Sequence, residues 1–543
     1  MNLIEKSSEQ GRLGAYITPG RDNAVKDTRD PGGEADRTAK SRRLAYTLIV
    51  AAALVRLAMA AAVPLVPDEA YYWEWSRRLA WGYFDHPPAI ALLIRAGTAV
   101  FGNTPLGVRV GSILAGFAAT AAGITLADRL AGGGAAWRAA LMVVAMPLAG
   151  IGLLLATPDV PLLCASAVAL WAVDHAIAPI LISPAALAPE SPGAREVGQE
   201  SAGRRRGRAV AWWIVAGAAI GIGIDAKFSA VLVAVGVALA CAAHPTLRRQ
   251  WTTPGPYLAV VAAGLVAFPV LAWNASHDWI SVQFQLRHGL GATGGSTMMR
   301  ELNLIGAQAA LVSPILFALQ LWAVVRALAR GSSPRAFLLA MVAATIFVFF
   351  AWSARSRVSP NWLAPAVLPS AVLLAITPAG RAILRWERAG VALGALMTMG
   401  IYLQVLHPVL PLRAARDPSS QAFGWDELAH AVETQPTTWV AGDRYQDAAE
   451  LAWHLRGHPT VFSLNIGGRR NQYDFWPTLR DRIRLGDSLT LVLDEREPPP
   501  PDIDALSPHF AEVTKGELVD MHRGSAVVAR RRLWHLSRLT SPL

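Results

Sequence analysis

Charged side chains are scarce in this chain. Asp, Glu, Lys and Arg make up 16% of its 543 residues, whereas hydrophobic residues make up 53%. This composition is too apolar for a soluble protein of this size and indicates a membrane protein. The net charge of +11 is typical either of nucleic-acid binding or of the positive-inside bias of membrane proteins, and the apolar composition favours the second. We therefore expect no nucleic-acid partner.

Cysteine is nearly absent, and internal repeats are not apparent. The two cysteines, Cys164 and Cys241, both lie within apolar runs. There they are expected to be small buried hydrophobic residues, which excludes a disulfide framework and a cysteine metal site. Internal repeats are typical of many transporter folds, so their lack argues against a transporter.

Apolar runs of about 15–25 residues recur along the chain and predict a polytopic helical membrane domain. Arg-rich stretches between the runs are assigned to the cytoplasm. The run 209–243 is too long for one helix and would bury charges in lipid, so we expect two spans that turn at Asp225–Phe228. Ala89–Phe101 is too short to cross and is expected to be an interfacial helix. The pattern predicts about eleven spans. They are expected at residues 44–66, 105–130, 137–156, 160–178, 209–243 (two spans), 257–273, 302–328, 337–352, 361–376 and 390–406.

The sequence outside these runs predicts two further parts. Residues 1–43 are polar and mixed in charge, which is typical of a disordered segment, here on the cytoplasmic side. Residues 409–543 are less apolar and are expected to form a small periplasmic α/β domain, with strands near 439–442, 461–464 and 489–493. Between them, residues 44–408 form the expected transmembrane domain, placed in a bacterial inner membrane with its outer loop at 67–88.

That outer loop, Pro67–Pro88, holds the clearest chemical pattern. On a helix beginning at Asp68, the side chains of Asp68, Tyr71, Tyr72 and Trp75 share one face because they are spaced i, i+3, i+4 and i+7. An aromatic face with a carboxylate at one end suits a sugar ring beside a proton acceptor. The plain structural alternative is a helix N-terminus with an acidic first turn at Asp68 and Glu69, and a cap of this kind can also be catalytic.

Other ionisable or polar residues are expected on the same side of the membrane. Charged groups at the ends of spans are costly unless they are paired or hydrated, so they are candidates for function, with snorkelling as the alternative. The candidates for substrate binding are Tyr71, Tyr72, Trp75, Asp85, His86, Arg109, Asp159, Lys227, His277, Asp278, Arg355, Arg357 and Asn361.

Several short motifs together resemble the integral-membrane glycosyltransferases of the GT-C fold, specifically glycosyltransferase family 39, which is similar to the protein O-mannosyltransferases. The resemblance covers about residues 44–480. Its motifs are DEAYYW at 68–73, DHPP at 85–88, TPD at 157–159, GIGIDAK at 221–227, NASHDW at 274–279, PNW at 360–362, DRY at 443–445 and NQYDFWP at 471–477. Each motif alone is weak evidence for the resemblance. The order in which the motifs occur together supports it.

The resemblance implies transfer of a sugar from a polyprenyl-phosphate carrier to an acceptor hydroxyl at the outer membrane face, with inversion at the anomeric carbon. It implies that Asp68 is the general base and that Glu69 orients the acceptor or a metal. The departing phosphate needs cations, for which Lys227 and Arg109 are the first candidates and Arg355 and Arg357 the next. The acceptor, whether lipid, glycan or protein, is left open.

A divalent cation is a further expectation, since carboxylates suit Mg²⁺ or Mn²⁺. The candidate ligands are Asp68, Glu69 and Asp159, with Asp85 and His86 as further possibilities. The segment 467–477 is rich in planar and polar side chains. It is expected either to fold back over the outer cavity or to be an ordered loop of the α/β domain.

Two other functions compete with glycosyl transfer. A transporter or flippase for a lipid-linked or charged solute would also carry ionisable residues within its spans. A non-catalytic envelope scaffold could keep a degenerate site. The clustering of acids at one membrane face favours the enzyme over both.

Overall fold

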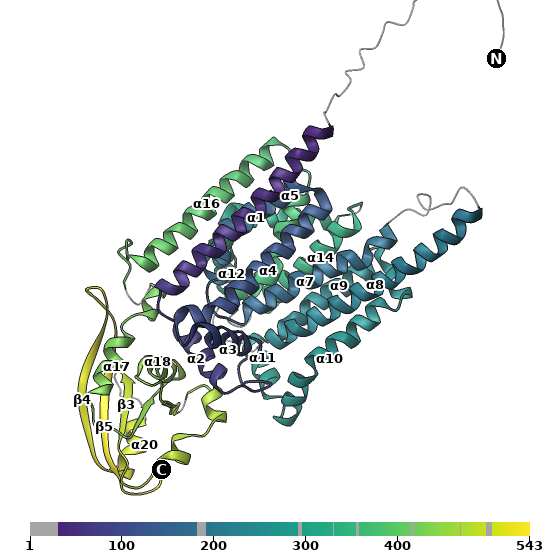
Figure 1. Ribbon diagram of the computed structural model, residues 1–543. Coiled ribbons are helices and arrows are strands. Elements are labelled where there is room, and N and C mark those ends of the chain that lie inside the picture. Colours follow the sequence, from purple (N-terminus) through teal and green to yellow (C-terminus); the bar gives the residue numbers. More distant parts are fainter. Residues whose placement is uncertain are drawn as a thin grey trace, which may run out of the picture.

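A computed structural model gives the architecture of the chain (Figure 1). It describes residues 31–181, 192–290, 296–329, 331–353, 358–413, 417–466, 468–495 and 502–543.

The chain folds into a bundle of helices followed by a domain built on a sheet. The helices of the bundle are α1 (Pro31–Ala62), α2 (Pro67–Arg77), α3 (Ala89–Phe101), α4 (Pro105–Ala131), α5 (Gly133–Ala145), α6 (Pro147–Gly152), α7 (Asp159–Ile177), α8 (Pro192–Ala226), α9 (Val231–Ala243), α10 (Gly255–Ser276), α11 (Ile280–Leu290), α12 (Thr297–Val312), α13 (Pro314–Leu328), α14 (Pro334–Trp352), α15 (Ala364–Ile376) and α16 (Arg381–Leu406). The C-terminal elements are α17 (Trp425–Glu433), β1 (Trp439–Gly442), α18 (Tyr445–His454), β2 (Phe462–Ser463), α19 (Leu479–Arg482), β3 (Leu489–Asp494), α20 (Asp502–Leu506), β4 (Phe510–Arg523) and β5 (Ala526–Leu539). Short 3₁₀ helices lie at Ala178–Leu181, Phe228–Ala230, Leu247–Thr252, Pro360–Leu363, Pro418–Ala422, Gln472–Phe475 and Ser507–His509.

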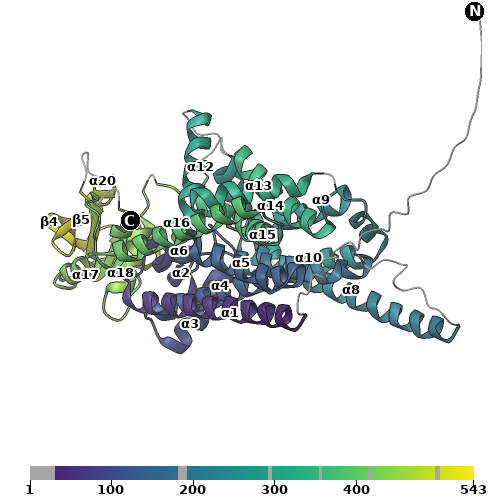
Figure 2. The same ribbon diagram turned by 90° about the horizontal axis from the view of Figure 1, so that it is seen from above.

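The long helices run side by side, and the sheet lies at one end of them (Figures 1 and 2). By length and composition, seven helices of the described chain can cross a membrane, or eight if one bent pair is counted as a single span. The protein is therefore a multi-pass membrane protein. The expectation of eleven spans is not met by this measure, because three expected spans fall on shorter apolar helices of 10–17 residues. These are Gly133–Ala145, Phe228–Ala243 and Pro360–Ile376.

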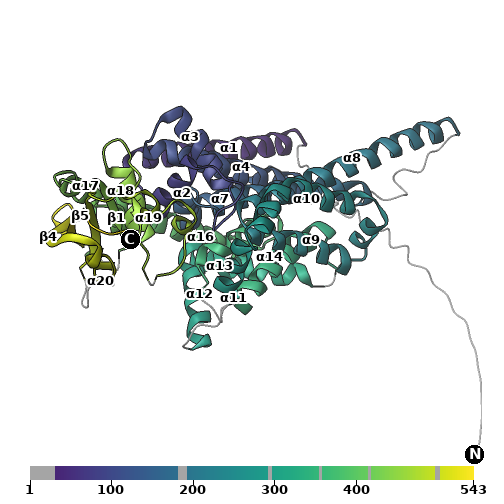
Figure 3. The ribbon, with the colours of Figure 1, turned by 90° about the horizontal axis from the view of Figure 1, so that it is seen from below.

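The bent pair corrects another expectation. Residues 302–328 were expected to form one span, but α12 and α13 meet at an angle of 106°. The break lies at Ser313, whose φ of 82° is in the left-handed region that interrupts a helix, and Pro314 then begins α13. As a result, α12 projects from the side of the bundle near the C-terminal domain (Figure 3).

The first helix also differs from the expected pattern. Helix α1 begins at Pro31, so the prediction of disorder over residues 1–43 is wrong for 31–43. Residues 1–30 lie outside the described part of the chain. The polar start of this helix continues into the apolar run, because no proline or glycine between Arg37 and Ala62 interrupts it.

The break expected near residue 227 is confirmed. Helix α8 ends at Ala226, Lys227 has extended backbone (φ −162°, ψ 133°), and α9 begins at Val231. The backbone thus leaves helical geometry where a helix would otherwise carry a charged side chain deep into the bundle. This break positions the Lys227 amine.

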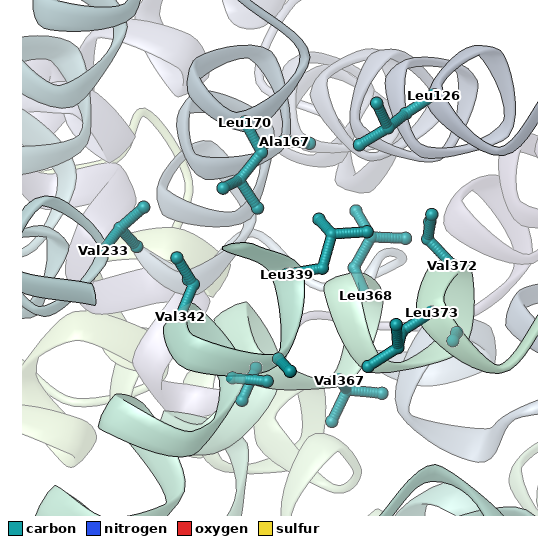
Figure 4. Packing of buried hydrophobic residues seen from close by; sticks show 14 of the residues in the cluster. Leu126, Ala167, Leu170, Val233, Leu339, Val342, Val367, Leu368, Val372 and Leu373 are labelled. Carbon is teal, nitrogen blue, oxygen red and sulfur yellow. The ribbon is translucent and has the colours of Figure 1, made fainter. Parts of the chain in front are cut away.

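Buried hydrophobic side chains from several helices pack together in the core of the bundle (Figure 4). Side chains of α4, α7, α9, α14 and α15 interlock there, including Leu126, Leu170 and Leu373. Glycine allows a close approach of two helices: a Cβ added at Gly236 of α9 would lie 2.6 Å from the Cα of Val342 in α14. A larger residue at this position would force these two helices apart.

The C-terminal domain contains a five-stranded sheet of order β2-β1-β3-β5-β4. The first three strands are parallel, whereas β5 is antiparallel to both β3 and β4. The expected strands near 439–442, 461–464 and 489–493 are confirmed. The long hairpin of β4 and β5 was not predicted, because Arg530–Arg532 and the polar residues of β4 hide the apolar alternation.

Helix α2 joins the two parts of the molecule. Its tryptophan Trp73 is fully buried and meets Trp453 of α18 edge to face, with 5.0 Å between the ring centroids. Buried residues of α2, α3, α17 and α18 form one hydrophobic cluster. The outer loop of the bundle is therefore part of the interface with the C-terminal domain.

Candidate active site

A polar cavity of about 230 Å³ lies where the bundle meets the C-terminal domain. It is lined by residues from α2, the 81–88 loop, the ends of several bundle helices and the C-terminal domain. They are Asp68, Tyr71, Tyr72, Asp85, His86, Thr157, Pro158, Asp159, Lys227, Phe284, Gln285, Ser359, Asn361, Trp362, Tyr445 and Arg469. Residues as distant in the sequence as Asp68 and Arg469 thus line one site.

The start of α2 aims its first polar residue at this cavity. Val66 is the N-cap and Pro67 opens the helix, so Asp68 and Glu69 stand in the first turn. Asp68, Tyr71 and Tyr72 line the cavity, as their common helix face predicts. Trp75 does not line it: this side chain is fully buried and stacks on Tyr83, with 4.4 Å between the ring centroids.

Glu69 and Arg109 form a buried ion pair away from the cavity lining. The guanidinium of Arg109 donates to both carboxylate oxygens of Glu69 and to the carbonyls of Ala60, Val63 and Pro64. The side chains of both members of the pair are 0% exposed. Arg109 thus ties the end of α1 and the start of α2 to α4, and its donors are not directed at a substrate. The placement of Arg109 beside Asp68 in one pocket is a prediction that the structure does not bear out.

Both carboxylate oxygens of Glu69 also accept hydrogen bonds from the backbone. The backbone N–H of Ala156 donates to Oε1 at 2.8 Å, and the N–H of Val66 donates to Oε2 at 3.2 Å. A carboxylate with this set of partners holds two loops together. It has no contact with the cavity that would support the expected role in orienting the acceptor.

Asp68 carries an accessible carboxylate in the cavity. Its Oδ1 accepts a hydrogen bond from the Tyr445 hydroxyl at 3.3 Å. The carboxylate is reached by solvent, yet the surrounding protein removes most bulk water, and this desolvation raises the pKa of Asp68. The Tyr445 hydrogen bond and the charge of Arg469 oppose that rise. A raised pKa brings a carboxylate closer to the range in which a general base works well.

Asp85 is held by a network that links the two domains. It accepts a hydrogen bond from the Tyr71 hydroxyl at 2.7 Å and pairs with Arg469 at 2.9 Å. Burial raises the pKa of Asp85 to about 6, although Arg469 and Tyr71 act to lower it. The backbone N–H of Gln472 in turn donates to the Tyr71 hydroxyl at 2.6 Å. Arg469 and Gln472 therefore contact the outer loop, and Arg469 lines the cavity.

Lys227 presents its amine to the opposite part of the lining. Its Nζ lies 2.7 Å from Oδ1 of Asp159, and Asn361 donates to the other oxygen of that carboxylate at 2.6 Å. The amine also lies 5.3 Å from the centroid of the Trp362 ring. These contacts fix a cation in a largely buried position, where it acts strongly on a developing negative charge.

A second, apolar cavity of about 300 Å³ borders the first. Both cavities are lined by Thr157, Asp159 and Asn361, so these three residues form their common edge. The remaining lining is nearly all aliphatic and comes from α4, α5, α6, α7, α12 and α15. The site therefore offers a charged polar compartment beside a hydrophobic one.

The other predicted site residues fall into three groups. His86 lies in the polar lining, where its Nδ1 is 3.4 Å from the side-chain nitrogen of Gln285. His277 and Asp278 are exposed and do not line the cavity, and the His277 ring stacks on Trp273 with 4.0 Å between centroids. Arg355 and Arg357 lie outside the described residues.

The expected metal ligands do not form a set. Glu69 is bound by Arg109, and both oxygens of Asp159 accept hydrogen bonds from Lys227 and Asn361. Within the described part of the chain, no group of three or more His, Cys, Asp or Glu residues is placed to hold a metal ion. These carboxylates do not fit a shared Mg²⁺ or Mn²⁺.

Tyr445, Arg469 and Trp362 are among the lining residues that sequence reasoning did not list as site residues. All three lie in or beside segments that the sequence singled out, namely the motifs at 443–445 and 360–362 and the segment 467–477. These segments could be recognised in the sequence, but no local sequence pattern shows that the C-terminal domain packs on the outer loop.

Comparison with known proteins shows one similar family. The family model described as dolichyl-phosphate-mannose-protein mannosyltransferase matches residues 85–179 and 204–273. The chain is similar to this family over these two segments. The matched segments contain the DHPP, TPD and GIGIDAK motifs and, with them, Asp85, Asp159 and Lys227 of the cavity lining.

A relative from Rhizobium johnstonii is named lipid A galacturonosyltransferase RgtD. It is 27% identical over 308 residues, which are 56% of this chain and 59% of the relative. The alignment thus spans less than two thirds of that protein's length.

Two solved structures share the fold of this chain. They are ArnT from Cupriavidus metallidurans bound to undecaprenyl phosphate (TM-score 0.58, 18% identity) and the same protein in the apo state (TM-score 0.57, 20% identity). Each comparison covers 90% of this chain and 97% of the other. This likeness shows the GT-C fold.

Proposed function

We propose that this protein transfers a sugar from a polyprenyl-phosphate carrier to an acceptor hydroxyl at the outer face of a bacterial inner membrane. One observation carries the proposal: the polar cavity with Asp68 and Lys227 shares an edge with an apolar cavity. A polyprenyl phosphate combines a long hydrocarbon chain with a charged head. The two adjoining compartments match these two parts.

Asp68 is the base in the proposed reaction. The acceptor hydroxyl gives its proton to the Asp68 carboxylate while its oxygen forms a bond to the anomeric carbon of the sugar. The bond between that carbon and the phosphate oxygen breaks, and the electron pair leaves with the polyprenyl phosphate. General-base help of this kind contributes roughly 10²–10⁴ to the rate. A single displacement inverts the anomeric carbon.

Lys227 receives the leaving group. Its amine lies at the edge of the apolar cavity through its contact with Asp159, which lines both cavities. Because Lys227 is only 6% exposed, little water screens its charge. The departing phosphate gains negative charge on its bridging oxygen and is stabilised there.

The name of one relative supports a proposal for the acceptor class. A lipid A galacturonosyltransferase uses a glycolipid acceptor by its name, and we propose a lipid A-type glycolipid here as well. The ArnT structure of the same fold holds undecaprenyl phosphate, which belongs to the carrier class proposed for this chain. The identity of the transferred sugar is to be determined by the experiment.

The test compares lipid A and other glycolipids by mass spectrometry in deletion and wild-type cells. We expect one hexose-, pentose- or uronate-sized mass to disappear on deletion and to stay absent when Asp68→Asn is expressed. The matched control is Asp278→Asn, since Asp278 is an exposed acid outside the cavity lining. Unaltered product in Asp68→Asn, with the protein inserted normally, contradicts the proposal.

Experiments on the deletion cells and on the purified protein distinguish the competing functions. Uptake of labelled substrate into proteoliposomes without sugar transfer would favour a transporter. A deletion that changes envelope integrity but no glycan mass would favour a scaffold. Transfer of sugar to the acceptor by purified wild-type protein excludes both.

A further inference from the structure

A second polar cleft lies on the C-terminal domain, apart from the proposed active site. It has a volume of about 280 Å³ and lies between the end of α2 and the sheet. Its lining consists of Arg78, Trp439, Thr460, Val461, Phe462, Tyr473, Trp476, Pro477 and Arg482. None of these residues lines the cavity that contains Asp68.

The charge of this lining has one sign. Two guanidiniums, those of Arg78 and Arg482, face the cleft from different elements, and no carboxylate belongs to the lining. Arg78 is held in place by Glu74 at 2.8 Å and by the face of Trp476, 4.3 Å from the ring centroid. Arg482 is exposed and makes no ion pair within 4.0 Å to any residue that the structure describes. The cleft thus has a fixed cation on one side and an available one on the other.

Aromatic faces complete the lining. Trp439, Tyr473 and Trp476 supply flat apolar surfaces, and Trp439 is oriented by a hydrogen bond to Asp487 at 2.8 Å. The Tyr473 hydroxyl is buried and has no hydrogen-bond partner among the described residues. A buried polar group of this kind is costly unless a ligand or water satisfies it. Flat rings beside guanidiniums suit a sugar that carries an anionic group.

The cleft is coupled to the active site by a pair of stacked tyrosines. Tyr71 lines the active-site cavity and Tyr473 lines the cleft, and their rings stack with 6.0 Å between centroids and 14° between planes. Asp68 and Arg78 mark the two ends of α2. At a rise of about 1.5 Å per residue they lie roughly 15 Å apart along the helix axis. A glycan headgroup with several sugars can reach from one site to the other.

We propose that this cleft binds an anionic saccharide portion of the acceptor, distant from the hydroxyl that receives the new sugar. The proposal rests on the proposed function, since it assigns a second contact to the same acceptor. The anion is a phosphate ester or a sugar carboxylate, and both meet a guanidinium through paired oxygens. The cleft would thereby select acceptors by their charge as well as by their reactive hydroxyl.

Binding to the full-length protein in detergent tests the cleft directly. The probes are glucose 1-phosphate, galacturonate, inorganic phosphate and the neutral methyl glucoside, measured by calorimetry. We expect at least one anionic sugar to bind more tightly than methyl glucoside and inorganic phosphate. Glucose 1-phosphate and galacturonate distinguish the phosphate ester from the carboxylate. Equal binding of neutral and anionic sugars, or no binding of either anionic sugar, overturns the proposal.

Arg482→Ala should weaken the binding of that anionic sugar about tenfold, the factor that corresponds to roughly one charge-assisted hydrogen bond. Arg484→Ala is the matched control, because Arg484 is an exposed arginine two positions away that does not line the cleft. Arg482→Lys should retain part of the affinity, since it keeps the charge but loses the planar fork. Equal affinity in Arg482→Ala and Arg484→Ala contradicts the assignment.

Kinetics then separate this proposal from the proposed function. We expect Arg482→Ala to raise KM for the acceptor about tenfold with little change in kcat, because the residue is far from the reacting atoms. If wild-type protein binds the anionic sugar but transfers no sugar, the proposed function fails and the binding cleft stands. If transfer is normal and Arg482→Ala leaves KM unchanged, the acceptor role of the cleft fails and the proposed function stands.

Discussion

The hydroxyl of Tyr445 donates a hydrogen bond to the carboxylate of Asp68, although 377 positions separate the two residues. Asp68 belongs to the outer loop of the bundle and Tyr445 to the first turn of α18 in the C-terminal domain. The C-terminal domain therefore completes the site around the proposed base. It also contributes Arg469, which pairs with Asp85.

Replacing Tyr445 with phenylalanine is expected to shift the acid limb of the pH profile. The lost hydrogen bond stabilises the charged form of Asp68, so the pKa of Asp68 should rise further in Tyr445→Phe. The base is active when deprotonated, so activity is lost as pH falls through its pKa, and this loss should begin at a higher pH in the variant. The measurement is kcat/KM for sugar transfer across pH. An unchanged acid limb would show that another group sets it.

Removing the Lys227 amine is expected to lower kcat about 10²–10³-fold, the usual effect of deleting one group that stabilises developing charge. Lys227→Met keeps the length of the side chain, and Asn361 still donates to Asp159 in the variant. Steady-state transfer assays with the polyprenyl-phosphate donor would measure the change. Lys227→Arg is the comparison that retains the charge. A loss confined to donor KM would assign Lys227 to binding alone.

Glu69 and Asp68 should respond to substitution in opposite ways. Breaking the buried pair of Glu69 and Arg109 leaves an uncompensated guanidinium, which costs about 3–5 kcal/mol. Glu69→Gln should therefore lower the thermal unfolding temperature of the purified protein clearly. Asp68→Asn should abolish transfer with little effect on that temperature, because the Asp68 carboxylate is exposed in the cavity. If the Glu69→Gln protein is stable but inactive, this result would support the catalytic role that the sequence predicts for Glu69.

Chelation is expected to leave sugar transfer unchanged. Glu69 and Asp159 are both engaged by protein donors, so the candidate carboxylates offer no common metal site. The assay compares the initial rate of protein treated with EDTA and exchanged into metal-free buffer with that of untreated protein. Loss of activity that Mg²⁺ or Mn²⁺ restores would show a metal requirement that these residues do not explain.

Much of the site could be predicted from local sequence patterns. The spacing of Asp68, Tyr71 and Tyr72 fixes a common helix face, and the charge of Lys227 inside an apolar run predicts a break in the helix. Both inferences concern neighbours along the chain. Trp75 shares the helical spacing but not the cavity, because Tyr83 folds back and covers it.

Arg109 does not line the cavity for a related reason. An arginine inside an apolar run must find partners, and sequence alone cannot say whether they are a substrate phosphate or the protein itself. In the structure, Glu69 and three carbonyls satisfy its donors. The expected count of spans is not met because three expected spans fall on apolar helices of only 10–17 residues.

The amino-acid sequence by itself determined that this is a helical membrane protein with a helix break at Lys227 and an acidic, aromatic outer loop, because apolar runs and helical spacing act between near neighbours. Only the tertiary structure decided which charges neutralise each other and which remain directed at a cavity. Glu69 and Asp68 are adjacent in the chain, yet one is locked to Arg109 and the other meets Tyr445 in the cavity. The physical reason is that a carboxylate's partners are supplied by whichever distant segments pack around it.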